Sequence, residues 1–123
     1  MDFLNKYTDQ SYAVFRIVLG FLFLCHGTQK LFGWPIAFPY DSSPLMMAAG
    51  VIEALGGAMI IAGFFSRIAA FICSGTMAVA YWMVHGLNDV FPIANGGELA
   101  VVYCFAFLFI AAKGPGIWSV NNK

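Results

Sequence analysis

Residues 16–33 read RIVLGFLFLCHGTQKLFG, an apolar stretch that carries two ionisable side chains, His26 and Lys30, near its carboxyl end. Extended toward the N-terminus, the stretch reaches roughly 20 residues, and a helix of that length crosses about 30 Å of hydrocarbon. Pro35 follows, and an α-helix does not continue through proline. We therefore predict a membrane-spanning helix over 12–32.

The composition supports a membrane protein. Of the 123 residues, 61% are apolar and only 10% are charged, whereas a soluble domain has about a quarter of its residues charged. A soluble fold of this size could not bury so much apolar surface. The formal net charge of zero gives no broad basic surface, so we expect no nucleic-acid partner. The N-terminus lacks the pattern of a removable signal peptide, so the first span is expected to stay in the mature protein.

Three more apolar segments predict spans over 45–64, 68–87 and 98–112. Each is longer than a barrel strand of about ten residues, and none alternates between polar and apolar residues. We therefore predict an all-α fold: a single domain, 1–123, that forms an integral membrane four-helix bundle with up-down-up-down topology. Membrane lipid is then its first partner, and the sequence leaves homo-oligomers open.

Basic residues predict the orientation of the bundle. All but one of the six lie at the termini or in the connection between the second and third spans, at Lys6, Arg16, Arg67, Lys113 and Lys123. Because positive residues favour the cytoplasmic side, both termini are predicted to be cytoplasmic. At that interface Arg16 and Arg67 are expected to extend their cationic groups toward water.

Each predicted span brings one further ionisable residue into the outer half of the bundle: His26, Glu53, His85 and Glu98. An unpaired charge in hydrocarbon costs about 2.5–3.5 kcal/mol, so these side chains should face the interior and pair. Depth predicts that Glu53 pairs with His26 or Lys30. It also predicts that Glu98 pairs with His85.

A redox pocket is the first of three interpretations of this cluster. Histidine and glutamate side chains beside a lipid-accessible cleft can bind the carbonyls of a quinone and exchange protons. In this interpretation His26 and His85 carry protons, Glu53 and Glu98 orient them, and Lys30 anchors an anionic or carbonyl group. Further candidate ligand-binding residues are Tyr81, four positions before His85, and Asn95, which also suits a helix cap before Glu98.

A metal site and a purely structural role are the other two interpretations. Two histidines and two carboxylates suit a transition metal in a bundle core, but the usual Glu-x-x-His pattern of di-metal bundles is absent. Ion pairs that only fix the register of the helices would need no ligand. No nucleotide-binding loop is present, so we expect neither flavin nor haem held by this chain alone.

The three cysteines occur singly, at Cys25, Cys73 and Cys104, and no CxxC pair is present. Such residues usually act as small buried hydrophobes. Cys25 and Cys104 fall in the outer halves of their predicted helices, so an oxidising compartment would permit a disulfide if the geometry allows it.

The ordered pattern of R-x-x-L-G, H-G-x-x-K-L-F-G, E-x-x-G-G, G-x-x-x-R, a late histidine, N-G-G-E and G-P-G resembles the DoxX family of small bacterial membrane proteins. The resemblance covers nearly the whole chain. It is carried by Arg16, Leu19, Gly20, His26, Gly27, Lys30, Leu31, Phe32, Gly33, Glu53, Gly56, Gly57, Gly63, Arg67, Met77, His85, Asn95, Gly96, Gly97, Glu98, Gly114, Pro115 and Gly116. One departure is Ser119-Val120-Asn121, where members often end in S-L-D.

This resemblance implies a multi-pass protein of the bacterial inner membrane. Some members are linked to thiosulfate:quinone oxidoreduction or to a membrane oxidoreductase complex with thiol-handling partners. The functional hypothesis is therefore a quinone- or thiol-linked oxidoreductase subunit that receives electrons from a redox partner protein. The alternative is a non-enzymatic scaffold, or a protein that binds a lipid-like ligand, in which the buried His, Glu and Lys side chains are structural.

Overall fold

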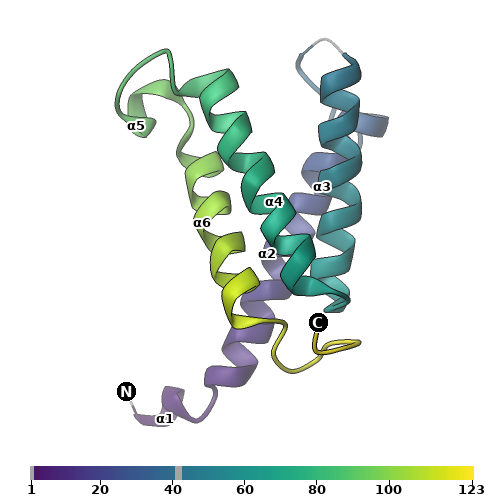
Figure 1. The fold of residues 1–123 in the computed structure, drawn as a ribbon, viewed down its shortest axis with the longest axis vertical. Helices are drawn as coiled ribbons and strands as arrows, with labels where there is room; N and C mark the ends of the chain where they lie inside the picture. Colours follow the sequence, from purple (N-terminus) through teal and green to yellow (C-terminus); the bar gives the residue numbers. More distant parts are fainter. Residues whose placement is uncertain (1, 41–42) are drawn as a thin grey trace.

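The computed structural model describes residues 2–40 and 43–123, and in these ranges every regular element is a helix. The elements in chain order are α1 (Asp2–Asn5), α2 (Thr8–Phe32), α3 (Pro44–Ala62), α4 (Ser66–Ala80), the π-helical turn η1 (Tyr81–His85), α5 (Pro92–Asn95) and α6 (Glu98–Lys113). In Figure 1 the long helices run side by side, and both termini lie at the same end. We call this the terminal end of the bundle.

Local sequence sets the ends of the long helices. Gly33 takes a left-handed conformation, with φ of 68°, and donates its N–H to the carbonyl of Gln29, which ends α2. Ser43 begins α3 by accepting a hydrogen bond from the N–H of Met46. Gly63 ends α3 in the left-handed region, so the chain turns directly into α4.

Three helical segments are long and apolar enough to cross a membrane: Thr8–Phe32, Pro44–Ala62 and Ser66–His85. The fold is therefore all-helical with three candidate spans, as the first three segments of the sequence predict. The helix α6 has 16 residues, which corresponds to about 24 Å of rise. It is shorter than the roughly 30 Å hydrocarbon layer, so a fourth span over 98–112 stays a prediction.

The helices pack in two pairs, α2 with α3 and α4 with α6. Glycines allow the first pair to approach closely. A Cβ on Gly27 would lie 2.3 Å from the backbone nitrogen of Ala54, and one on Gly57 would lie 2.7 Å from that of Leu24. Small residues at such crossings let helix backbones touch in membranes. The α2–α3 pair is consequently a fixed unit against which α4 and α6 pack.

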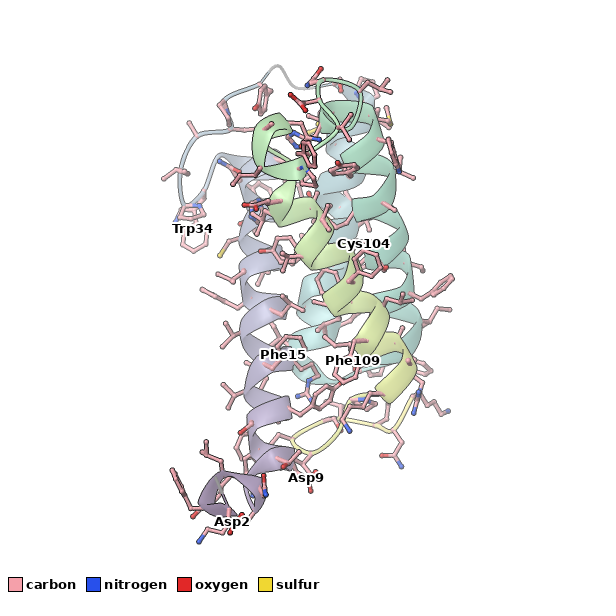
Figure 2. All side chains as sticks on the ribbon, turned by 90° about the vertical axis from the view of Figure 1, so that its left-hand side faces the viewer. Asp2, Asp9, Phe15, Trp34, Cys104 and Phe109 are labelled. Carbon is pink, nitrogen blue, oxygen red and sulfur yellow. The ribbon has the colours of Figure 1, made fainter. Side chains whose placement is uncertain are left out.

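Apolar side chains cover the outside of the bundle, as Figure 2 shows for Phe15 on α2 and Phe109 on α6. Phe15 is 39% exposed and Phe109 is 52% exposed. The largest apolar residues inside include Phe23, Phe107 and Ile60, which are fully buried. A surface of this kind suits hydrocarbon as its solvent, because lipid imposes no cost on exposed apolar groups.

Arg16 does not extend toward water as predicted but is fully buried at the terminal end. It donates hydrogen bonds to the carbonyls of Ile60, Pro115, Ile117 and Trp118. The reason is that the chain after α6 folds back over α2 and α3, and its backbone carbonyls supply the acceptors that a buried guanidinium needs.

The other predicted interfacial arginine, Arg67, is exposed. Its guanidinium donates to the carbonyls of Ala111, Ala112 and Lys113, the last residues of α6. A cation at this position satisfies carbonyls that have no partner within the helix. Arg16 thus attaches the C-terminal segment to α2 and α3, whereas Arg67 joins the start of α4 to the end of α6.

Candidate functional site

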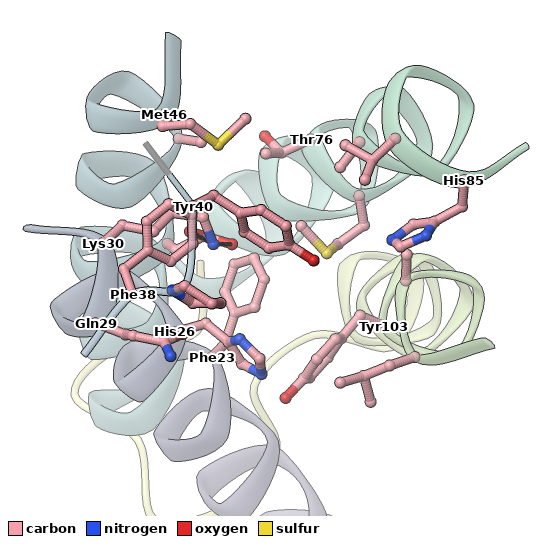
Figure 3. Close-up of a pocket in the computed structure, with 18 of the residues that line it drawn as sticks. Phe23, His26, Gln29, Lys30, Phe38, Tyr40, Met46, Thr76, His85 and Tyr103 are labelled. Atoms are coloured by element: carbon pink, nitrogen blue, oxygen red, sulfur yellow. Dashed lines mark hydrogen bonds and ion pairs between the residues drawn. The ribbon is translucent and has the colours of Figure 1, made fainter. Parts of the chain in front are cut away.

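A cavity of about 560 Å³ lies at the end of the bundle opposite the terminal end. Side chains from α2, α3, α4, η1 and α6 line it, together with Phe38, Pro39 and Tyr40 from the loop after α2 (Figure 3). Four of the seven predicted site residues are among the lining: His26, Lys30, Glu53 and His85. The cavity therefore brings ionisable groups from three elements to one space.

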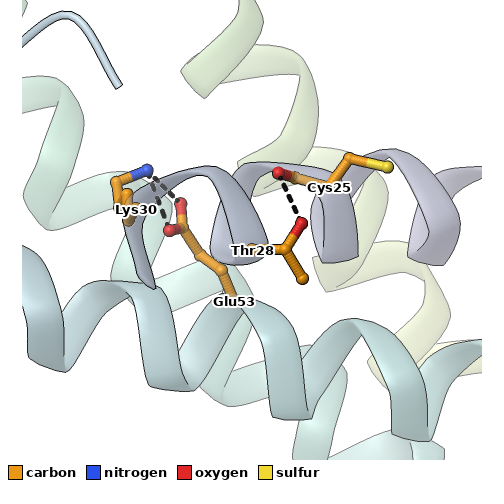
Figure 4. Close-up of polar contacts among 4 residues, drawn as sticks. All are labelled: Cys25, Thr28, Lys30 and Glu53. Atoms are coloured by element: carbon orange, nitrogen blue, oxygen red, sulfur yellow. Dashed lines mark hydrogen bonds and ion pairs between the residues drawn. The ribbon is translucent and has the colours of Figure 1, made fainter. Parts of the chain in front are cut away.

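Lys30 and Glu53 form an ion pair between α2 and α3 (Figure 4). The Lys30 Nζ lies 2.8 Å from Oε2 of Glu53 and donates a hydrogen bond of 3.0 Å to Oε1. The side chain of Glu53 is only 3% exposed, and that of Lys30 is 15% exposed. Of the two partners predicted for Glu53, Lys30 is thus the one confirmed. The ammonium also lies 5.5 Å from the centre of the Phe38 ring, a cation–π contact.

His26 lies one turn before Lys30 on the same face of α2, and its ring meets Tyr103 of α6 edge-on. The two ring centroids are 5.8 Å apart, with planes at 86°. Tyr103 is 4% exposed and stacks on Phe107 with an interplanar angle of 8°. This contact joins the α2–α3 pair to α6 across the cavity, so His26 has a fixed orientation.

Sequence reasoning missed Tyr103. A signal was available: Tyr103 and Phe107 are four residues apart, so two aromatic rings fall on one face of α6. The wall formed by Phe38 and Tyr40 was also missed, because aromatic residues in a loop after a span suit the lipid–water interface equally well.

His85 is half-buried at the end of the π-helical turn η1. Its Nδ1 lies 3.1 Å from the carbonyl oxygen of Asn95. Single π-helical turns within longer helices occur frequently at functional sites. In Figure 3 the ring extends into the cavity from the side opposite Lys30. His85 is therefore the ionisable group of the second helix pair in this space.

Asn95 and Tyr81 lie behind His85, and neither lines the cavity. The Asn95 side chain donates to the Tyr81 hydroxyl at 2.9 Å and to the Asp89 carbonyl at 3.2 Å, and it accepts from the N–H of Gly97 at 2.8 Å. Tyr81, a predicted ligand-binding candidate, thus has its hydroxyl directed to the α5 loop rather than to the cavity. Asn95 is 9% exposed and holds that loop together.

Glu98 also departs from its prediction. It is exposed, does not line this cavity, and forms no ion pair with His85; the described residues contain the single pair Lys30–Glu53. Leu99 and Tyr103, four residues apart, face the cavity, and Glu98 lies about 100° from Leu99 around the helix. Its carboxylate instead occupies the first turn of α6, where the helix dipole favours a negative charge.

No cysteine lines the cavity, and Cys25, Cys73 and Cys104 are all free thiols. The predicted option of a disulfide between Cys25 and Cys104 is therefore not realised in this structure. Across residues 2–40 and 43–123, no three His, Cys, Asp or Glu side chains come together in a way that could hold a metal ion. The ionisable groups of the cavity are thus an ion pair and two separate imidazoles.

Apolar helices of spanning length, an apolar outer surface and a cluster of polar groups in a cavity between the helices define a multi-pass membrane protein. A comparison with family models matches the DoxX model over residues 11–86. The chain belongs to the DoxX family, as its motifs predict.

Two relatives extend this assignment. An uncharacterised protein of Haemophilus influenzae is 42% identical and matches 100% of this chain and 97% of its own length. The inner membrane protein YqjF of Escherichia coli is 25% identical and matches 97% of this chain and 95% of its own length. No solved structure matches the chain. Family, relatives and helices together place the protein in the bacterial inner membrane as a multi-pass protein.

Proposed function

We propose that the cavity binds the headgroup of a lipid-soluble quinone and that the chain is the membrane subunit of a quinone-linked oxidoreductase. One observation carries the proposal: His26, His85 and the Lys30–Glu53 pair line a single, mainly apolar cavity of about 560 Å³. This volume lies within the range of roughly 300–1,000 Å³ that is typical of small-molecule sites.

The lining matches the chemistry of a quinone. The headgroup is a flat ring with carbonyl oxygens, and aromatic walls such as Phe38, Tyr40 and Tyr103 favour flat rings. Lys30 and His26 supply hydrogen-bond donors on the α2 side. The ligand's tail would remain among the lipid chains that surround the helices.

Reduction of a quinone to a quinol takes up two electrons and two protons. Imidazoles exchange protons near neutral pH, which assigns proton transfer to His26 and His85. The electrons come, in this proposal, from a redox partner protein. Between the quinone-linked and thiol-linked forms of the hypothesis, the cavity favours quinone because none of the three cysteines lines it.

The proposal includes an orientation. Arg67, Lys113 and Lys123 lie at the terminal end, and positive residues favour the cytoplasm. The cavity then lies toward the outer face of the inner membrane, with α6 as a short fourth span. A reporter fused after Lys123 should read as cytoplasmic, and a periplasmic signal would contradict this orientation.

A non-enzymatic scaffold is the second candidate. The observation in its favour is that Lys30–Glu53 joins α2 to α3, which a purely structural ion pair would also do. The two candidates differ in what they require of His85, because in the described part of the chain its ring bonds only to the Asn95 carbonyl through Nδ1 and forms no ion pair. A scaffold needs that bond, whereas the quinone site also uses Nε2.

Binding of a short-chain benzoquinone to the purified protein in lipid nanodiscs tests the proposal. We expect saturable binding by the wild type and at least about tenfold weaker binding by the His26→Ala variant, which removes one hydrogen-bonding group at the ring. Glu98→Gln is the matched control, since that side chain lies outside the cavity, and it should bind normally. Absence of saturable binding, or equal binding by His26→Ala, would contradict a quinone site.

A further inference from the structure

We propose that the cavity selects the reduced, hydroxyl-bearing form of its ligand, and that His85 is the residue that makes the selection. This inference rests on the proposed function in one respect: the ligand is taken to be a quinone–quinol couple. The selection depends on which nitrogen of His85 carries a proton, and the hydrogen bond between His85 and Asn95 determines this.

The backbone carbonyl of Asn95 determines the tautomer of His85. Nδ1 lies 3.1 Å from that oxygen. A carbonyl oxygen has lone pairs and no proton to give, so Nδ1 is the donor. A neutral imidazole has only one N–H, and Nε2 therefore carries a lone pair. A hydrogen bond at one ring nitrogen is the usual way in which a protein determines whether the other nitrogen donates or accepts a hydrogen bond.

The acceptor for this bond is itself held in place. The side chain of Asn95 bonds to the hydroxyl of Tyr81, the carbonyl of Asp89 and the N–H of Gly97. The ring of Tyr81 also lies against Gly97, where a Cβ would come within 2.7 Å of it. With three bonds on its side chain, Asn95 cannot readily turn its carbonyl away from His85. In the neutral form of His85, the lone pair therefore lies on Nε2.

Nε2 forms no hydrogen bond within the described part of the chain, and His85 lines the cavity. The ring extends toward the space between Tyr40 and Tyr103 in Figure 3. A lone pair at this position is satisfied by a ligand that donates a hydrogen bond, such as the hydroxyl of a quinol. The carbonyl of a quinone would place two acceptors against each other, and a buried acceptor without a donor is unfavourable.

The groups on the opposite wall do not make this distinction. Lys30 is a donor and Glu53 is an acceptor, so their ion pair can satisfy either a carbonyl or a hydroxyl. No hydrogen bond to a described residue fixes which nitrogen of His26 carries its proton, so His26 can serve either form. Selection between the two oxidation states therefore falls to His85.

Tighter binding of the reduced form has a consequence for the bound couple. A tenfold preference for the quinol raises the two-electron reduction potential of the bound couple by about 30 mV relative to the free couple. The cavity would thereby make the quinone a better electron acceptor. This direction agrees with a subunit that passes electrons to the quinone pool.

Three ligands that share the same ring system test the inference. They are a decyl benzoquinol, the corresponding quinone, and the dimethyl ether of the quinol, which keeps the ring but has no free hydroxyl. Their affinities for the wild-type protein in nanodiscs are measured without oxygen at about pH 8, where most imidazoles are neutral. We expect the quinol to bind about tenfold more tightly than the other two. The His85→Leu variant should lose this preference, whereas Glu98→Gln should keep it.

The outcomes separate this inference from the proposed function. Equal affinities of the wild type for all three ligands would overturn the inference and leave a quinone site intact. No binding of any of them would overturn both. A preference for the quinol that persists in His85→Leu would show that another group makes the selection. The comparison of ligands on the wild type decides whether the cavity selects the quinol even if the variant does not fold, and the His85→Leu variant decides whether His85 makes the selection.

Discussion

Lys30 and Glu53 bind each other across the α2–α3 interface, with Nζ 2.8 Å from Oε2, in the wall of the cavity that His26 and His85 share. Burial removes water from both charged groups of an ion pair, which costs free energy. The attraction between the two charges offsets this cost only while both partners are present. The pair is therefore at once a connection between helices and a pair of polar groups available to a ligand. These two roles can be separated by experiment.

Removal of one partner should destabilise the fold strongly. Glu53→Leu leaves the Lys30 ammonium without its carboxylate, and we expect a loss of about 3–5 kcal/mol in the free energy of unfolding. The double variant Lys30→Met, Glu53→Leu removes both charges and should lose much less. Chemical unfolding in detergent checks this. A double variant as unstable as the single one would show that the ion pair is not the source of the effect.

The double variant also distinguishes the two candidate functions. If the ion pair only fixes the register of α2 and α3, a folded double variant should bind a benzoquinone as the wild type does. If the cavity is a quinone site, the double variant should bind the benzoquinone more weakly than the wild type does, because Lys30 and Glu53 line the cavity. Normal binding would remove the pair from the site and favour a structural role.

The buried guanidinium of Arg16 should be irreplaceable by an amine. Arg16→Lys keeps the positive charge but cannot reach carbonyls on α3 and on the C-terminal segment together. We expect the last residues of the chain to detach, so that carboxypeptidase digests the variant faster than the wild type. The control is Arg67→Lys, which alters an exposed arginine. Equal resistance to digestion in Arg16→Lys would contradict a holding role for Arg16.

Close packing of α2 on α3 predicts a sharp difference between two glycine substitutions. In Gly27→Ala the new methyl group would lie 2.3 Å from the backbone of Ala54, so the helices must move apart. In Gly75→Ala nothing lies within 4 Å, and the substitution should be neutral or stabilise α4 by up to about 1 kcal/mol. The melting temperatures of the two variants should therefore shift in opposite directions or differ widely. Similar temperatures would be inconsistent with the packing described.

Tyr103 should matter chiefly through its ring. Tyr103→Ala removes the contacts with His26 and Phe107, and an aromatic residue truncated in a core costs about 3–5 kcal/mol. Tyr103→Phe keeps the ring and should retain most of the stability. Unfolding measurements on both variants test this. A large loss in Tyr103→Phe would instead assign the main role to the hydroxyl.

The sequence predicted most of the fold because membrane helices must satisfy their backbone groups internally and therefore have a minimum apolar length. The apolar length of the segments therefore predicts the first three spans, and proline and glycine residues mark where their helices end. It also predicted that Glu53 pairs with His26 or Lys30, since these residues lie at similar depth and a charge in hydrocarbon requires a partner, and Lys30 is the partner in the structure.

What the sequence could not supply was helix rotation and the path of the chain outside the helices. Depth alone paired Glu98 with His85, but the register of α6 turns Glu98 outward while Tyr103 faces the cavity. Arg16 was assigned to the interface, because nothing in the pattern showed that the C-terminal segment returns to cover it. Both errors concern contacts between segments far apart in the sequence.

Photolabelling is the most direct test of whether the cavity binds a quinone. A benzoquinone that carries a photoreactive azide is irradiated with the protein in nanodiscs, and labelled peptides are identified by mass spectrometry. The account predicts labels on cavity residues such as Tyr40, Met77 and Tyr103, and their loss when unlabelled quinol is added in excess. Labels confined to lipid-facing residues such as Phe15 and Phe109, or unaffected by competitor, would contradict a quinone site in the cavity.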